Sequence, residues 1–160
     1  MKWFLEHGAD PSLNDDGLSS PLDSAACKGT TTTISLLLKH GAKLDESNAL
    51  QAAAIGSLGI PMMEYLLDCG FDINAFDVSK KPVLTRGGIG TALHMAAKEG
   101  YKDRVQFLLE RGALRDIKRE DKVCSMTPAE WAKRHGKMEI YEMLSKSTGA
   151  ASVRRHSLQR

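Results

Sequence analysis

The chain has 160 residues and a mass of 17.5 kDa, a length typical of one domain, and 42% of its residues are hydrophobic, which is enough to fill a core. Charged residues make up 26% and the formal net charge is +2, so the composition argues against a wholly disordered chain and gives no sign of a polyanion-binding protein. Residues 145–160 hold basic but no acidic side chains. The sequence therefore predicts a globular body followed by a basic tail.

The cysteines and the hydropathy pattern favour an intracellular protein. Cys27, Cys69 and Cys124 are too far apart for a C-x-x-C pair, and unpaired cysteines fit a reducing compartment. Residues 1–8 lack the pattern of a secretory signal. The most apolar region, residues 49–67, is too broken by polar residues, glycine and proline to match a span of about 20 apolar residues. We expect a soluble protein of the cytoplasm or nucleus with no membrane partner.

Two short sequence blocks recur along the chain. The first reads SPLDSAA at residues 20–26, NALQAAA at 48–54, TALHMAA at 91–97 and TPAEWAK at 127–133. The second reads FLEHGAD at residues 4–10, LLKHGAK at 37–43, LLDCGFD at 66–72 and LLERGAL at 108–114. From Ser20 to Gly41 and from Thr91 to Gly112 the distance is 21 residues both times. Such a fixed spacing predicts one structural unit repeated in register.

Each unit predicts two helices separated by a turn. A hydroxyl residue before proline, as at Ser20 and Thr127, starts a helix because its oxygen accepts from free backbone amides. The alanine pairs of the first block allow close packing, and we expect Gly29 and Gly100 to end this helix as left-handed caps. Apolar residues at i, i+3 and i+4 mark the second helix. These stripes are Ile34, Leu37 and Leu38, then Met63, Leu66 and Leu67, then Val105, Leu108 and Leu109.

The two blocks resemble the T-P-L-H-x-A-A and L-L-x-x-G-A blocks of the ankyrin repeat, which recurs about every 33 residues. The resemblance covers roughly residues 1–148 and implies an all-α solenoid of stacked helix-turn-helix units joined by hairpin loops. We expect a partial repeat at 1–11, repeats at about 12–44, 45–74, 87–115 and 124–148, and a disordered basic tail at 149–160. Proteins with such stacks bind protein partners on a concave face made by first helices and loops.

The spacing of the blocks varies most in the loops. From Gly41 to Asn48 is seven residues where other units lead us to expect twelve, whereas the loop after Gly70 has nine residues more than expected. We expect this insertion, residues 76–90, to project as a flexible basic finger. Its basic residues are Lys80, Lys81 and Arg86.

The chain begins inside a second helix whose first helix is absent. Phe4 and Leu5 stand before Gly8 where Leu108 and Leu109 stand before Gly112, so the N-terminus looks truncated. We expect this half repeat to dock on the next unit, to leave apolar side chains exposed, and to allow self-association.

No residue pattern indicates catalysis, a metal site or a cofactor. A glycine-rich run at 87–90 opens a helix but lacks the preceding strand and the Lys-[ST] pair of a phosphate loop, and there is no G-x-S-x-G motif. Basic residues alternate with acidic ones and aromatics are 6%, so we do not expect nucleic-acid binding. We expect His94 to bond loop backbone and Trp131 to pack. The histidines are dispersed, at His7, His40, His94, His135 and His156.

These observations favour a non-enzymatic protein-interaction module or scaffold. The expected contacts project from the ends of the first helices and from the finger, and they are Lys28, Lys80, Lys81, Arg86, Lys98, Glu99, Arg134 and His135. The alternative is a substrate-recruiting or regulatory segment of a larger enzyme-linked assembly, such as a ubiquitin-ligase adaptor or a signalling ATPase. The half repeat at Met1 favours this alternative.

Two short motifs suggest modification. Residues 154–158, RRHSL, resemble a site for basic-directed serine kinases, with Ser157 as acceptor. The run from Leu66 to Asn74 resembles the L-x5-D-I-N pattern of ankyrin domains that are hydroxylated at asparagine. The other interpretation of Asn74 is a loop asparagine that bonds backbone.

Overall fold

The computed structural model describes residues 2–13, 19–77, 90–118 and 126–146, and these residues form nine α-helices and no strand. In chain order the helices are α1 (Lys2–Glu6), α2 (Pro21–Lys28), α3 (Thr31–Lys39), α4 (Ala49–Ile55), α5 (Ile60–Asp68), α6 (Ala92–Glu99), α7 (Lys102–Glu110), α8 (Pro128–Arg134) and α9 (Met138–Lys146). The prediction of an all-α repeat architecture is confirmed.

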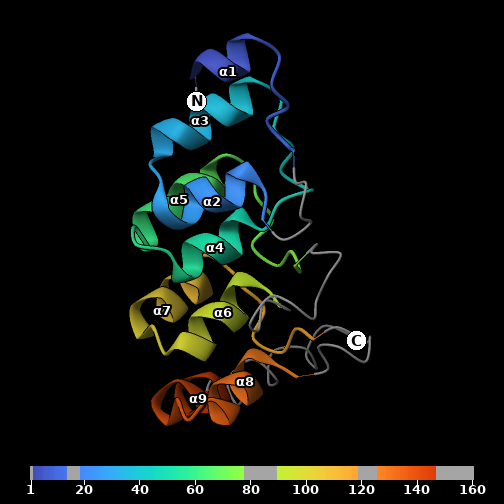
Figure 1. Cartoon of the computed structure of the whole chain (residues 1–160). Helices are drawn as coiled ribbons and strands as arrows, with labels where there is room; N and C mark the ends of the chain where they lie inside the picture. The colour runs from blue at the N-terminus through green and yellow to red at the C-terminus, as the bar shows by residue number, and fades with distance from the viewer. Residues whose placement is uncertain (1, 14–18, 78–89, 119–125, 147–160) are drawn as a thin grey trace, which may run out of the picture.

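The helices form two rows in one elongated stack (Figure 1). The first helices α2, α4, α6 and α8 pack one on the next, and each packs on the second helix that follows it, α3, α5, α7 or α9. The loops that join successive units leave the stack on one side (Figure 1). This arrangement is a solenoid, in which each unit contacts only its neighbours.

Helix starts follow the local sequence. Ser20 Oγ accepts from the backbone N–H of Asp23 at 3.2 Å, and Thr127 Oγ1 accepts from that of Glu130 at 3.3 Å, as predicted. The start of α4 differs, because there Ser47 Oγ accepts from the backbone N–H of Ala49 at 3.1 Å. A neighbouring hydroxyl thus takes the capping role that serine or threonine has in the other first helices.

One of the two predicted glycine caps is wrong. Gly100 is left-handed, with φ +83°, but Gly29 has φ −93° and ψ −155°, which is extended backbone. Gly29 is suited to its place for a different reason, since a Cβ there would lie 2.7 Å from the carbonyl oxygen of Ala25. Close approach of the backbone favours glycine at this position.

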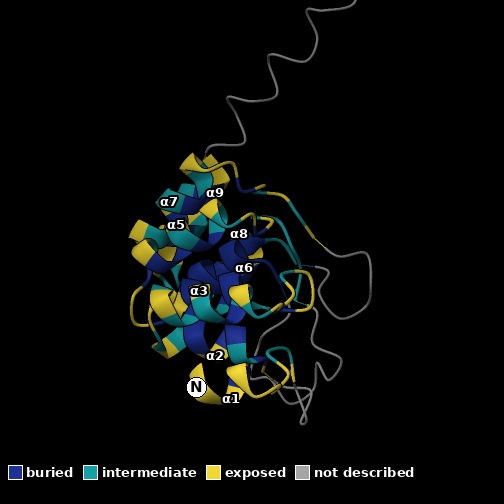
Figure 2. Cartoon of the chain, turned by 90° about the horizontal axis from the view of Figure 1, so that it is seen from above, coloured by how far each residue is buried: buried dark blue, intermediate teal, exposed yellow. Residues whose placement is uncertain are grey.

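The core runs along the interface between the two rows, which Figure 2 shows as the dark band of buried residues. The alanine pairs of α2, α4 and α6 are buried, as expected from their close packing. In the second helices the first two residues of each predicted stripe are buried, while Leu38, Leu67 and Leu109 are half-buried. The apolar stripe of each second helix therefore predicts core residues correctly at its first two positions, and its third residue is only half-buried.

The two ends of the long insertion, residues 76–90, lie next to each other. Asp77 donates its backbone N–H to the carbonyl oxygen of Gly90 at 3.1 Å, so the two described ends of the insertion lie together. Residues 78–89 lie outside the described residues, and so do the predicted contacts Lys80, Lys81 and Arg86. The tail at 149–160, with Ser157, lies outside them as well.

Candidate protein-interaction site

A ladder of buried polar side chains bonds three first helices to backbone groups of the loops that lead into the following units. The residues are Asp23 of α2, Gln51 of α4 and His94 of α6, each three positions after the residue that begins its block. Asp23 accepts from the backbone N–H of Ser20 at 2.8 Å with Oδ2, and from that of Asn48 in the next unit at 2.7 Å with Oδ1. One carboxylate thus caps its own helix and holds the neighbouring unit.

The other two members also bond to the backbone of the loop that follows, each with a different polar group. Gln51 Nε2 donates to the carbonyl oxygen of Ala75 at 3.0 Å. His94 Nδ1 accepts from the backbone N–H of Thr91 at 3.1 Å, and Nε2 lies 3.1 Å from the carbonyl oxygen of Met126. Because Nδ1 accepts, the proton of the neutral ring is on Nε2, which donates to Met126. The expectation that His94 bonds loop backbone is confirmed.

Burial sets the protonation of this ladder. It lowers the pKa of His94 from its ordinary 6.5 to about 4, and the hydrogen bond to Met126 opposes this shift only in part. Burial also raises the pKa of Asp23, against the hydrogen bonds from Ser20 and Asn48 that favour its carboxylate. His94 is therefore neutral near pH 7, and its ring packs edge-on against Trp131 at 5.5 Å between centroids. Trp131 packs in the core, as predicted.

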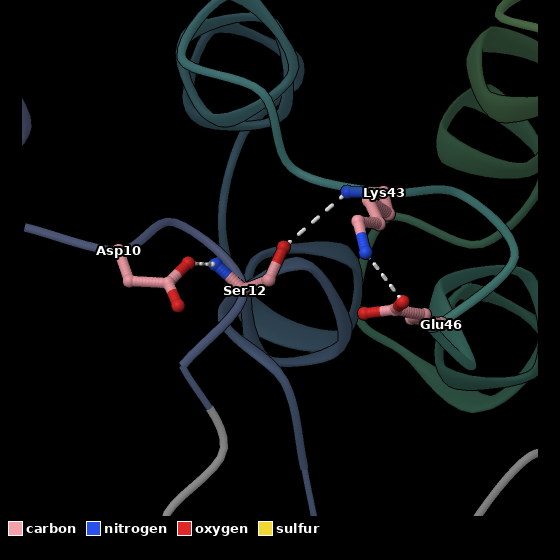
Figure 3. Close-up of polar contacts among 4 residues, drawn as sticks. All are labelled: Asp10, Ser12, Lys43 and Glu46. Carbon is pink, nitrogen blue, oxygen red and sulfur yellow. Dashed lines mark hydrogen bonds and ion pairs between the residues drawn. The ribbon is translucent and has the colours of Figure 1, made fainter.

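A second ladder joins the loops (Figure 3). Asp10 Oδ1 accepts from the backbone N–H of Ser12 at 2.8 Å, and Ser12 Oγ accepts from the backbone N–H of Lys43 in the next loop at 3.4 Å. Lys43 Nζ in turn pairs with Glu46 Oε1 at 2.7 Å. The bond between Ser12 and Lys43 holds the loop after α1 against the loop after α3.

The same pattern returns further along the stack. Asp72 Oδ1 accepts from the backbone N–H of Asn74 at 2.9 Å, and Asn74 Oδ1 accepts from the backbone N–H of Leu114 at 2.9 Å. The interpretation of Asn74 as a loop residue that bonds backbone is confirmed. Hydroxylation of Asn74 stays a prediction.

The described members of the expected contact set lie at the carboxyl ends of first helices. Lys28 ends α2, Lys98 and Glu99 end α6, Arg134 ends α8, and His135 follows it. Lys28, Glu99 and His135 hold the same position, eight residues after the start of their blocks. The stacking of the first helices therefore brings these side chains into one row.

These side chains are not equally free. Lys28, Glu99, Arg134 and His135 are exposed, whereas the side chain of Lys98 is only 16% exposed and its Nζ lies 3.7 Å from Glu99 Oε1. The His135 Nδ1 lies 2.9 Å from the carbonyl oxygen of Trp131, which orients its ring at the helix end. Arg134 Nη1 contacts Met126 Sδ at 3.9 Å but pairs with no acid of the described residues, so the row offers Lys28 and Arg134 as exposed cations without an acidic partner there.

Two arginines at α7 contact the preceding unit, and these contacts were not predicted from the sequence. Arg104 Nη1 of α7 donates to the carbonyl oxygen of Ala54 at 2.9 Å, and its guanidinium lies 4.2 Å from the ring centre of Tyr101. Gly59 allows this, because a Cβ there would lie 2.9 Å from the guanidinium. Arg111 Nη2 pairs with Glu64 Oε1 at 2.7 Å. The partners are some 50 positions apart in the chain, so no local pattern could indicate them.

Across the part of the chain that the structure describes, no group of three or more His, Cys, Asp or Glu side chains could hold a metal ion. Within the same residues, no helix has the length and apolar character needed to cross a bilayer. The exposed side chains at the ends of the first helices and in the loops can make noncovalent contacts with another molecule.

Stacked helix pairs joined by loops on one side define the class of α-solenoid interaction proteins. The chain belongs to the ankyrin repeat family. Its residues 1–77 match the description "Ankyrin repeats (3 copies)" and residues 90–121 match "Ankyrin repeat". The two matches leave out 78–89, the middle of the insertion. Ankyrin repeats are protein-interaction modules.

Three similar proteins place these repeats in different contexts. "Ankyrin repeat and KH domain-containing protein mask-1" of Caenorhabditis elegans is 32% identical over 142 residues, which is 86% of this chain and 5% of that protein. "Ankyrin repeat and SOCS box protein 6" of Homo sapiens is 29% identical over 72% of this chain and 28% of its own length. "Probable E3 ubiquitin-protein ligase XBOS33" of Oryza sativa subsp. japonica is 40% identical over 38% of this chain and 11% of its own length. The chain spans less than a third of each of these relatives.

Proposed function

We propose that this chain is a scaffold that binds a partner protein through its concave face and loop fingers. The observation that carries the proposal is the row of exposed charged side chains at the ends of α2, α6 and α8. The residues that hold the stack together, Asp23, Gln51 and His94, are buried and separate from that row. A partner can therefore be recognised without any change to the contacts that keep the units stacked.

The charges of the proposed contact set favour an acidic partner. Lys98 lies beside Glu99, so these two charges offset each other locally. Lys28 and Arg134 remain, and the insertion adds Lys80, Lys81 and Arg86. Complementary charge across an interface contributes mainly to specificity and to the rate of association, and salt weakens it.

Charge reversal tests this proposal. Wild-type protein, the triple variant K80E/K81E/R86E and the double variant K28E/R134E are used to capture partners from lysate at two salt concentrations. We expect both variants to retain less of an acidic partner, with a weaker dependence on salt than the wild type. The double variant K39E/K146E is the matched control, because it reverses charges on exposed residues of α3 and α9. Identical partner sets and amounts for all four proteins would overturn the proposal.

A second candidate is a substrate-recruiting segment of a ubiquitin-ligase adaptor. The similarity to an ankyrin repeat and SOCS box protein and to a probable E3 ubiquitin-protein ligase supports it. Sequencing of transcripts across the Met1 codon separates the two candidates. A reading frame that continues upstream into further repeats or an effector domain would support the adaptor, and a stop codon directly upstream would contradict it.

A further inference from the structure

A pocket of about 270 Å³ opens between two successive loops near the start of α4. Its apolar lining comes from Leu44 in the first loop, Leu50 in α4, and Phe71 and Ala75 in the second loop. Gln51 fixes the position of the second loop, because its Nε2 donates to the carbonyl oxygen of Ala75 at 3.0 Å. We call this pocket the loop notch.

The loop notch coincides with the shortest of the loops that join successive units. Gly41 and Asn48 are seven residues apart, whereas Gly8 and Ser20 are twelve apart. Loops along this stack lie against each other, as the bond from Lys43 to Ser12 shows. A loop that is five residues shorter has less chain with which to cover the beginning of α4 and the face of the next loop. The short loop therefore accounts for the opening of the pocket at this place.

Two carboxylates stand among the lining residues of the notch. Asp45 and Asp72 both line the pocket and are exposed. Among the described residues, Asp45 makes no ion pair, and Asp72 uses only Oδ1, which accepts from the backbone N–H of Asn74. The nearby cation Lys43 is engaged by Glu46 at 2.7 Å. Asp45 also attracts Lys43, but this one lysine stands among three carboxylates, those of Asp45, Glu46 and Asp72, so the notch combines an apolar lining with net negative charge.

We propose that the loop notch binds an extended peptide segment of a partner protein, with one large apolar side chain in the pocket and a neighbouring lysine or arginine beside Asp45 and Asp72. The volume is below the roughly 300–1,000 Å³ of small-molecule sites, and it suits a single side chain. Two carboxylates at an apolar pocket select a cationic side chain by charge complementarity. The inference rests on the protein-binding role proposed above but uses other residues, those of the notch, and a partner segment of opposite charge.

Selection from a random peptide library tests this directly. Twelve-residue peptides displayed on phage are selected on the immobilised full chain, and the affinities of the enriched peptides are measured at low and high salt. We expect a consensus with a large apolar residue next to lysine or arginine, bound more weakly at high salt. Overall charge would not produce this consensus, because the chain carries a net charge of +2.

Three variants locate the binding. D45N/D72N keeps the shape of the notch and an acceptor for Asn74, and we expect the enriched peptides to bind it about three- to tenfold more weakly, as for the loss of two exposed charge contacts. A75F fills the pocket and should abolish binding. D116N is the matched control, because Asp116 follows Gly112 by the same four positions as Asp45 follows Gly41, and it should bind as wild type.

Several outcomes would overturn the proposal. These are the absence of a consensus, an acidic consensus, or undiminished binding to A75F with its helical circular dichroism retained. If A75F loses its helical signal, equal affinities for D45N/D72N and D116N would overturn the proposal instead. Enrichment only on a chain in which 78–89 is replaced by a Gly-Ser linker would show that the occupant is this chain's own segment. The library contains no native partner, so these results are independent of the capture experiment.

Discussion

Helices α1 and α7 carry the same sequence block but differ in what covers them. Phe4 and Leu108 both stand four residues before the glycine of the block, yet Phe4 is 63% exposed and Leu108 is fully buried. Helix α7 packs on α6, whereas among the described residues no first helix precedes α1. The block therefore specifies a helix with an apolar face, and the neighbouring unit decides whether that face becomes core.

The aromatic residues of α1 cover each other in part. The Trp3 ring stacks on His7 at 4.1 Å between centroids and meets Phe4 edge-on at 5.3 Å, while Leu5 is buried. Trp3 nevertheless stays 61% exposed. Helix α1, the first of the described helices, thus holds apolar surface on the outside, whereas the helices in the middle of the described stack hold it inside.

The largest effect is expected for a charge placed in the middle of the stack. Ala96 of α6 is fully buried between helices, so Ala96→Glu overpacks that contact and buries a charge without a partner. We expect a loss of at least about 4 kcal/mol in the free energy of unfolding, enough to unfold this unit. Urea unfolding followed by circular dichroism measures it. Ser24→Glu on the exposed face of α2 is the control, and similar losses for both would contradict the packing described.

Alanine substitutions at Phe4 and Leu108, which hold the same position in the block, test the comparison of α1 with α7 most simply. Leu108→Ala should lower the free energy of unfolding by about 2–5 kcal/mol, because it leaves a cavity in the core. Phe4→Ala should change it by less than about 1 kcal/mol, because the ring is exposed. Denaturant unfolding of both variants gives the difference. Equal losses would mean that Phe4 is covered in solution.

His94 makes the stability of the middle units depend on pH. Its folded-state pKa of about 4 lies below the ordinary 6.5, so as the pH falls from 6.5 to 4 the unfolded chain binds a proton first. The stabilisation is therefore complete above about pH 6.5 and is lost toward pH 4, by up to about 3 kcal/mol.

The matched variant for this pH dependence is His94→Gln, because Gln51 already fills the same position in α4. The raised pKa of Asp23 acts in the opposite direction, since its stabilisation is lost as the pH rises, and it is common to both proteins. The difference between wild type and variant thus isolates His94. A difference that does not change between pH 7 and pH 4, or an NMR titration of His94 near pH 6.5, would contradict a buried neutral ring.

The loop ladder should contribute less. Asn74→Ala removes the acceptor for the backbone N–H of Leu114 and should cost about 1 kcal/mol of unfolding free energy. Ser12→Ala should cost less, because the corresponding bond to Lys43 is longer, at 3.4 Å. Thermal unfolding of the two variants side by side gives the order. A larger loss for Ser12→Ala would reverse the expected ranking.

The smallest effect on stability is expected for Trp3→Lys, but this variant should change the oligomeric state. Exposed apolar patches of this kind favour association. We expect wild-type protein to associate as its concentration rises and the variant to stay monomeric in sedimentation equilibrium, with nearly equal unfolding free energies. Wild-type protein that is monomeric throughout would exclude self-association through α1.

The fold could be predicted from local signals, and the site only in part. The capping hydroxyls of Ser20 and Thr127 and the apolar stripe of α7 act within a few residues, so the sequence suffices to place these helices. The prediction of a left-handed backbone at Gly29 was wrong. Glycine is needed there because a Cβ would clash with the carbonyl oxygen of Ala25, and not because the turn requires a positive φ.

The position of a residue in the repeat predicted which charged side chains lie at the ends of first helices. It did not predict how exposed these side chains are. Lys28 and Lys98 both end first helices, yet only Lys98 lies beside an acid and is largely covered. The contact of Arg104 with Ala54 and the loop notch arise between units, where the sequence gives no local signal. The exposure of a side chain and the contacts between units depend on how the units stack. The repeat period of the sequence gives the order of the units but not these contacts.

Hydrogen exchange of the chain bound to a captured partner, localised by mass spectrometry, tests most directly whether the first-helix row and the loops form the binding face. We expect slower exchange at the carboxyl ends of α2, α6 and α8 and in the loops, relative to the free chain, with α3, α5, α7 and α9 unchanged. Protection confined to these second helices would contradict the proposed function.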